Sequence, residues 1–202
     1  MKAIKFYVKQ TFVPFVYLIF VSVISMAIMY IDDSVLPLKI VLGVLNLGLY
    51  AVVVFGMGYK MGQEGLKARV ANDTERRNII RTGEDRPLKL HEEYKWWKGA
   101  LFGLIVCIPL VLLLIVHAIL SSINPAYFGA GTVATWLYLV IYSFVIMFGG
   151  QGLYQAPAQA YYALLSIPIL MLILGVSYYL GARKIQRQQD AIKEIHRDIY
   201  GE

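Results

Sequence analysis

Residues 99–182 have the sequence GALFGLIVCIPLVLLLIVHAILSSINPAYFGAGTVATWLYLVIYSFVIMFGGQGLYQAPAQAYYALLSIPILMLILGVSYYLGA, which contains no Asp, Glu, Lys or Arg over 84 residues. Lys98 and Arg183 close this stretch at its two ends. A charged side chain at the centre of a membrane helix costs about 2.5–3.5 kcal/mol, so a chain that crosses a membrane excludes such side chains from its spans. The stretch therefore predicts an all-α integral membrane protein.

The composition of the whole chain agrees with this class. Hydrophobic residues make up 58% of the 202 residues and charged residues 16%, whereas an ordinary globular domain has about 25% charged residues. Since one span needs about 20 residues, the chain has room for a few spans and for no separate soluble domain. We expect a single membrane domain over residues 1–202. The net charge of +6 is explained by positive loops on the cytoplasmic side, so we expect no nucleic-acid partner.

Four apolar segments are long enough to cross the bilayer, and two hydrophilic segments separate or follow them. The predicted spans are about 11–31, 38–59, 99–120 and 161–181. The first is longer than the apolar core of a signal peptide, so we expect it to remain uncleaved. The loop 60–98 is basic, breaks at Arg81–Asp85 and is expected to start a short helix at Pro87. The first two and the last two spans would form two helical hairpins.

The distribution of positive charge predicts how the spans are oriented. Placing the amino terminus, the loop 60–98 and the tail 182–202 on one side puts 18 of the 19 Lys and Arg residues there, with Lys39 opposite. We expect this side to be cytoplasmic, in the plasma membrane. The chain must then cross an even number of times between Lys98 and Arg183. Four crossings would need about 80 of the 84 residues, so two crossings are expected.

The outer segment 121–160 is the weakest part of this topology. It contains the apolar run 136–148, which has 13 residues and is flanked by glycines. Runs of about 10–14 apolar residues are typical of re-entrant, interfacial or buried helices. We therefore expect a short re-entrant or interfacial outer helix within 132–149. The alternative is five spans, which would put the basic tail outside.

The tail carries an apolar edge on a charged helix. Its members are isoleucines at seven-residue spacing with one more between them: Ile185, Ile192, Ile195 and Ile199. Two heptads are short for a coiled coil. We expect the helix to lie against the basic loop or the membrane surface.

Small residues recur near the basic ends of the spans. They are Gly58, Gly62, Gly99, Gly103, Ser177 and Gly181. Small residues four apart let helix backbones approach closely, so these six are expected to pack the protein's own helices, with a dimer interface as the alternative. The pattern small-x-small-Tyr-x-x-Gly occurs twice, at 56–62 and 175–181. It indicates either a parallel repeat of two hairpins or convergence at span ends.

Five polar residues are candidates for binding a neutral or amphipathic ligand. They are Asn46, His117, Asn124, Gln151 and Gln155. Hydrogen bonding between helices also explains Asn46, and His117 lies about 27 Å along its span, near the far edge of the apolar core. With Asp32, Asp33 and Asn124, His117 could form a polar or metal cluster at the outer face. Headgroup-level anchoring equally explains the tyrosines and glutamines of the outer segment.

The chain carries none of the common catalytic motifs. It has no GxSxG, no GxxxxGK and no HExxH. We expect no enzyme activity, no cofactor and no metal site. The leading hypothesis is an accessory or membrane subunit that acts through another membrane protein or a homo-oligomer within the lipid bilayer. The alternatives are a small transporter or substrate-binding component, and a membrane-embedded enzyme that depends on His117 or on the pair Asp32 and Asp33.

Overall fold

The computed structural model describes residues 2–83, 87–124, 127, 129–141 and 157–200. Over these residues the chain forms helices and connecting turns, without strands. The elements are α1 (Lys2–Met29), η1 (Asp33–Val35), α2 (Leu36–Thr82), α3 (Lys98–Val106), α4 (Ile108–Ile123), α5 (Gly129–Leu137), η2 (Pro157–Leu165) and α7 (Ser166–Tyr200). The predicted all-α class is confirmed for the described part of the chain.

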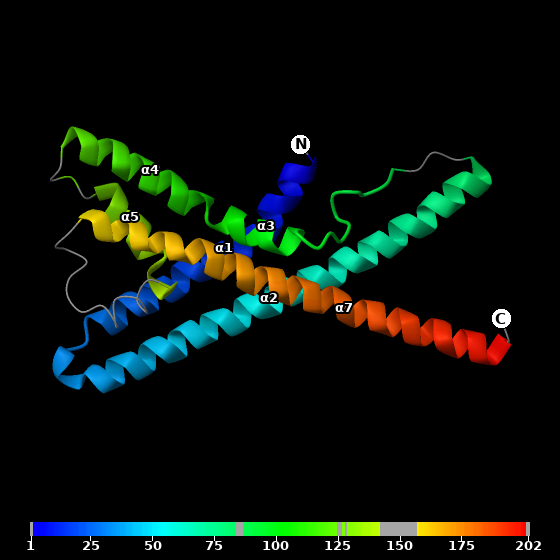
Figure 1. Ribbon diagram of the computed structural model, residues 1–202, viewed down its shortest axis with the longest axis horizontal. Helices are drawn as coiled ribbons and strands as arrows, with labels where there is room; N and C mark the ends of the chain where they lie inside the picture. The colour runs from blue at the N-terminus through cyan, green and yellow to red at the C-terminus, as the bar shows by residue number, and fades with distance from the viewer. Residues whose placement is uncertain (1, 84–86, 125–126, 128, 142–156, 201–202) are drawn as a thin grey trace.

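Three to four of these helices are long and apolar enough to cross a membrane. They are α1, α2 and the helix that includes α7, with α3 and α4 together as a fourth if the bent pair is one span. Helix α7 packs against both α2 and α3, and α1 packs against the same two helices. Figure 1 shows α2 and α7 crossing near the middle of the molecule and then diverging. We call the end of the bundle that holds Lys9, Lys60, Lys98 and Arg183 the basic end.

The third predicted span is broken rather than continuous. Helices α3 and α4 meet at Cys107 with a bend of 44°. Pro109 is at the second position of α4, where it has no N–H to donate and its ring would clash with the carbonyl group four residues earlier. At the bend, the Cys107 N–H donates both to the Gly103 carbonyl group at 3.3 Å, four residues earlier, and to the Leu104 carbonyl group at 3.0 Å, three residues earlier. The predicted span 99–120 is therefore bent in its middle, and it remains one span if the bent pair crosses the membrane together.

Two helices extend well beyond the predicted spans. Helix α2 has 47 residues, which is about 70 Å at 1.5 Å per residue, more than twice the thickness of a bilayer core of about 30 Å. It ends where Gly83 adopts φ 71° and donates its N–H to the Ile79 carbonyl group at 2.8 Å. The predicted break at 81–85 thus begins with a left-handed glycine cap. Helix α7 likewise continues without interruption from the bundle to Tyr200.

Helix α5 lies alongside α4 in the opposite direction. Its Gly131 lies against the ring of His117 near the end of α4, and the following Tyr138 donates its hydroxyl to the Val106 carbonyl group near the α3–α4 break. Ser22, in the middle of α1, donates its hydroxyl to the Leu137 carbonyl group at 2.9 Å. The segment 129–141 therefore runs from the end opposite the basic end into the centre of the bundle. The rest of the predicted helix, 142–149, lies outside the described residues.

Candidate functional site

The predicted ligand residue Asn46 holds the first hairpin together. Its side chain is buried and donates to the Val21 carbonyl oxygen at 3.1 Å and to Ser25 Oγ at 2.8 Å, both on α1. These two bonds use both protons of the amide nitrogen. Asn46 is thus engaged between α1 and α2.

His117 is buried beneath α5 and η2. Its side chain is 1% exposed. A Cβ atom at Gly131 would lie 2.7 Å from His117 Nδ1, and the Tyr161 ring lies 5.8 Å from the imidazole. Ser121 Oγ is 3.4 Å from the same nitrogen. The structure therefore packs His117 against its neighbours on α4, α5 and η2, in a different set of contacts from those of Asn46.

The other predicted ligand residues are not gathered around His117 in the described structure. Asn124 is exposed and caps the end of α4. Gln151 and Gln155 lie outside the described residues. Within the part of the chain that the structure describes, no group of three His, Cys, Asp or Glu side chains could hold a metal ion.

The two copies of the small-x-small-Tyr-x-x-Gly pattern meet at the crossing of α2 and α7. A Cβ atom at Gly58 would lie 2.0 Å from Ser177 Oγ. A Cβ atom at Gly62 would lie 1.9 Å from the Tyr178 carbonyl oxygen, and one at Gly181 would lie 1.9 Å from the Tyr59 carbonyl oxygen. The contacts are thus reciprocal between the copies, and each final glycine lies against the tyrosine carbonyl group of the other helix.

The remaining glycines of this group lie between α3 and α7. A Cβ atom at Gly99 would lie 2.7 Å from the Leu174 carbonyl oxygen, and one at Gly103 would lie 2.7 Å from the Leu170 carbonyl oxygen. All six small residues named from the sequence therefore lie at contacts between the protein's own helices.

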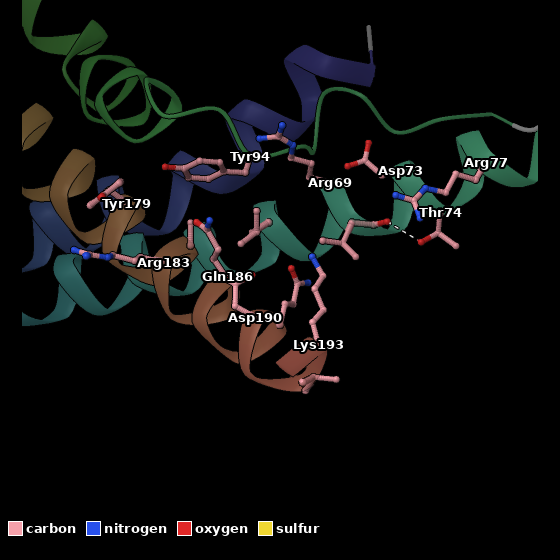
Figure 2. Close-up of a pocket in the computed structure, with 15 residues that line it drawn as sticks. Arg69, Asp73, Thr74, Arg77, Tyr94, Tyr179, Arg183, Gln186, Asp190 and Lys193 are labelled. Atoms are coloured by element: carbon pink, nitrogen blue, oxygen red, sulfur yellow. Dashed lines mark hydrogen bonds between the residues drawn. The ribbon is translucent and has the colours of Figure 1, made fainter. Parts of the chain in front are cut away.

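Beyond the crossing, α2 and α7 diverge and leave an open cleft of about 620 Å³ at the basic end. Figure 2 shows Arg69, Thr74 and Arg77 on α2 and Arg183, Gln186 and Lys193 on α7, on opposite sides of this space. The remaining lining residues are Leu66, Val70, Asp73, Tyr94, Tyr179, Ala182, Gln189, Asp190 and Ile192. Cationic, apolar and amide groups thus face one another across the cleft.

The narrow end of the cleft is closed by tyrosines. The Tyr94 ring stacks on the Tyr178 ring with centroids 5.2 Å apart and planes 11° from parallel. The Tyr94 N–H donates to the Gly65 carbonyl oxygen at 2.8 Å. Burial raises the pKa of Tyr94 above its usual value. Together these contacts hold the connecting segment at the point where the two helices separate.

The segment 87–97 has no helix, so the predicted short helix at Pro87 was wrong. Its polar groups bind α2 instead. Asn72 donates to Glu93 Oε1 at 2.8 Å and accepts the Lys89 N–H at 3.2 Å, while Arg76 binds the same Glu93 oxygen at 3.0 Å. Bonds to partners 17 and 21 residues away override the local helical pattern.

Lys98 fixes the other end of this segment. Its side chain is 1% exposed, and Nζ donates to the carbonyl oxygens of His91, at 2.8 Å, and of Glu93. The ammonium also lies 6.0 Å from the centroid of the Tyr7 ring on α1. Lys98 therefore ties the connecting segment to the start of α3 and to α1.

The isoleucine edge of the tail is largely uncovered. Ile185 is buried in the bundle, whereas Ile192, Ile195 and Ile199 are 64%, 58% and 68% exposed. Because α7 is one continuous helix, these residues project away from the bundle with it. Among the described residues the expected packing against the basic loop is therefore absent beyond Ile185, whereas the expected alternative, contact with the membrane surface, stays a prediction.

Compared with protein-family models, curated proteins and solved structures, the chain has no match in any of the three. The cleft is the functional candidate that sequence reasoning missed. Its apolar residues lie on two separate segments of the sequence, Leu66 and Val70 on one and Ile192 of the tail on the other. The packing of α2 and α7 at the shared glycine pattern brings them to the same space.

Proposed function

We propose that the protein is a four-span plasma-membrane protein whose amino terminus, loop 60–98 and tail 182–202 are cytoplasmic. The distribution of basic residues supports this arrangement, because 18 of 19 would face the cytoplasm. In this arrangement the bent pair of α3 and α4 is one span, and α5 is part of a re-entrant segment that enters from the outer side. The contacts of Leu137 and Tyr138 with the centre of the bundle support the re-entrant assignment.

We propose further that the protein is a non-enzymatic accessory or membrane subunit that acts through a protein partner. The observation that carries this proposal is the cleft between the extensions of α2 and α7. From Tyr59 to Thr82, α2 continues for about 35 Å beyond the crossing, far more than is needed to return the chain to the membrane. Helices this long that pack on each other only at the crossing leave much of their surface free for another molecule.

The chemistry of the cleft favours a macromolecule over a small ligand. Small-molecule sites are concave and enclose most of the ligand surface, whereas this cleft opens between two projecting helices. Its lining includes Val70 and Ile192, which are 37% and 64% exposed. Apolar side chains exposed in a polar surrounding are typical of protein interaction surfaces.

Purification from the native membrane in a mild detergent tests this function. We expect the full chain to elute with a second protein in a fixed molar ratio, identified by mass spectrometry and retained when the chain is tagged at either end. A matched preparation of an unrelated tagged membrane protein gives the background. Elution of the chain as a lone monomer, before and after chemical cross-linking of the intact membranes, would contradict the proposed function.

A further inference from the structure

We propose that the cleft binds one amphipathic helix of another protein, which has an apolar edge flanked by acidic residues and completes a three-helix bundle with α2 and α7. This inference rests on the proposed function and deepens it by specifying the chemistry of the partner.

The first support is the regular arrangement of the lining residues. On α2 they occupy positions 66, 69, 70, 73, 74 and 77, and on α7 positions 179, 182, 183, 186, 189, 190, 192 and 193. Spacings of three and four residues place each set on one face of its helix. Each face extends over about three turns or more, roughly 16 to 21 Å. Two helical faces with a space between them provide the ridges and grooves against which a third helix packs.

The second support is the apolar part of the lining. Leu66, Val70 and Ile192 contribute aliphatic surface from both helices, and Tyr179 adds a half-exposed ring. A helix with apolar residues at i, i+3, i+4 and i+7 would bury this surface. The closed tyrosine end at Tyr94 limits how far toward the membrane such a helix can reach.

The third support is the sign of the charge. The lining holds four basic residues, Arg69, Arg77, Arg183 and Lys193, against two acidic residues. One of the acidic residues, Asp73, already pairs with Arg76 at 2.9 Å. Arg69 and Arg77 come from α2, and Arg183 and Lys193 come from α7, as Figure 2 shows. Acidic residues on both sides of the partner's apolar edge would complement them.

A second copy of this chain fits the cleft poorly. The α2 extension, residues 60–82, contains six basic and three acidic residues, and residues 183–200 of α7 contain five basic and three acidic residues. Either helix from another copy would bring net positive charge into a cleft that is already net positive. The charge balance therefore favours a different, acidic chain.

Site-specific photocross-linking in native cells tests the inference. Benzoylphenylalanine is placed at Val70 or Ile192 inside the cleft, and at Ile80 or Ile199 on the same helices but outside its lining. We expect both cleft positions to cross-link one segment of one protein at least fivefold more than the two outer positions. The captured segment should have apolar residues at helical spacing with Asp or Glu on both flanks.

Charge reversal gives the matched control. R69E with R183E should lower the cleft cross-link at least tenfold, whereas R81E with R197E, which changes the net charge equally outside the lining, should lower it less than twofold. Gel filtration of each variant verifies that it remains folded.

Cross-links from the cleft to a second copy, to lipid or to a basic segment would overturn the inference. So would equal effects of the two charge reversals. If the protein elutes with a partner but the cleft positions do not cross-link to it, the inference fails and the proposed function stands. A chain that elutes alone, as described above, contradicts both.

Discussion

Replacing Gly62 with alanine should separate α2 from α7 at their crossing. The new Cβ atom would lie 1.9 Å from the Tyr178 carbonyl oxygen, about 1.5 Å short of ordinary van der Waals contact at 3.4 Å. The obstructing atom belongs to the backbone, so no side-chain rotation relieves the overlap. The helices must move apart, which loosens the neighbouring contact between Gly181 and the Tyr59 carbonyl group as well.

The size of the effect follows from two opposing terms. Overpacking costs about 1–3 kcal/mol, and a backbone overlap belongs at the upper end. Alanine favours the helix by about 1 kcal/mol relative to glycine, which leaves a net loss of about 2 kcal/mol. For a chain of this length that corresponds to a Tm lower by about 4–8 °C.

Gly56 provides the control on the same helix. A Cβ atom at Gly56 would meet nothing within 4 Å, so alanine there should leave the Tm unchanged or raise it by a few degrees. Thermal unfolding of the purified protein in detergent, followed by tryptophan fluorescence, measures both variants. If Gly62→Ala proves as stable as Gly56→Ala, the close crossing of α2 and α7 is wrong.

Three further perturbations test other contacts. Gly131→Ala should lower the Tm because its Cβ atom would lie 2.7 Å from His117 Nδ1. Adding His117→Ala to this variant should restore much of the lost Tm, and strictly additive effects of the two substitutions would refute the contact. Lys98→Met removes the donor to two carbonyl groups and should speed tryptic cleavage at Lys89 and Lys95 several-fold. An unchanged cleavage rate would contradict the role of Lys98 in anchoring the connecting segment. Asn46→Val should lower the free energy of unfolding by about 0.6–1.7 kcal/mol, measured by melting in detergent. Asn46→Asp buries a carboxylate and should lower it further; an equal or smaller loss for Asn46→Asp would argue against a buried amide.

The elements that local patterns control were predictable. Apolar length indicated the helices, and Gly83 marked the end of α2 because a left-handed cap is favourable for glycine. The small residues of the repeated pattern were identified because close helix approach demands them. These features depend on neighbours within one or two helical turns.

The remaining features depend on partners distant in the sequence. A proline is tolerated in the first turn of a helix, so Pro109 alone does not distinguish a break from a continuous span. The path of residues 87–97 depends on Asn72 and Gly65, on another element. The cleft itself combines residues more than 100 positions apart, for which a single sequence carries no local signal.

The candidate ligand residues show the same division. Asn46 was recognised as the deepest polar side chain, but its partners on α1 became clear only from the packing. Its amide protons are used within the hairpin, so the described residues offer no specific support for the transport alternative. His117 was predicted near the far edge of the apolar core, and the packing of Gly131 explains why it is buried there.

Side-specific labelling of two cysteines tests the central claim, that a protein partner occupies a cytoplasmic cleft between α2 and α7. Thr74 lines the cleft and Thr82 lies on the same helix outside its lining; both are exposed and donate a hydroxyl to the carbonyl group four residues earlier. In separate variants, each is replaced by cysteine in a chain whose natural Cys107 is buried.

A membrane-impermeant maleimide should label neither cysteine in intact cells. In inside-out native vesicles it should label position 82 quickly and position 74 several-fold more slowly, and the two rates should become equal after the chain is purified away from its partner. Labelling of either position in intact cells, or equal rates in the native vesicles, would contradict the claim.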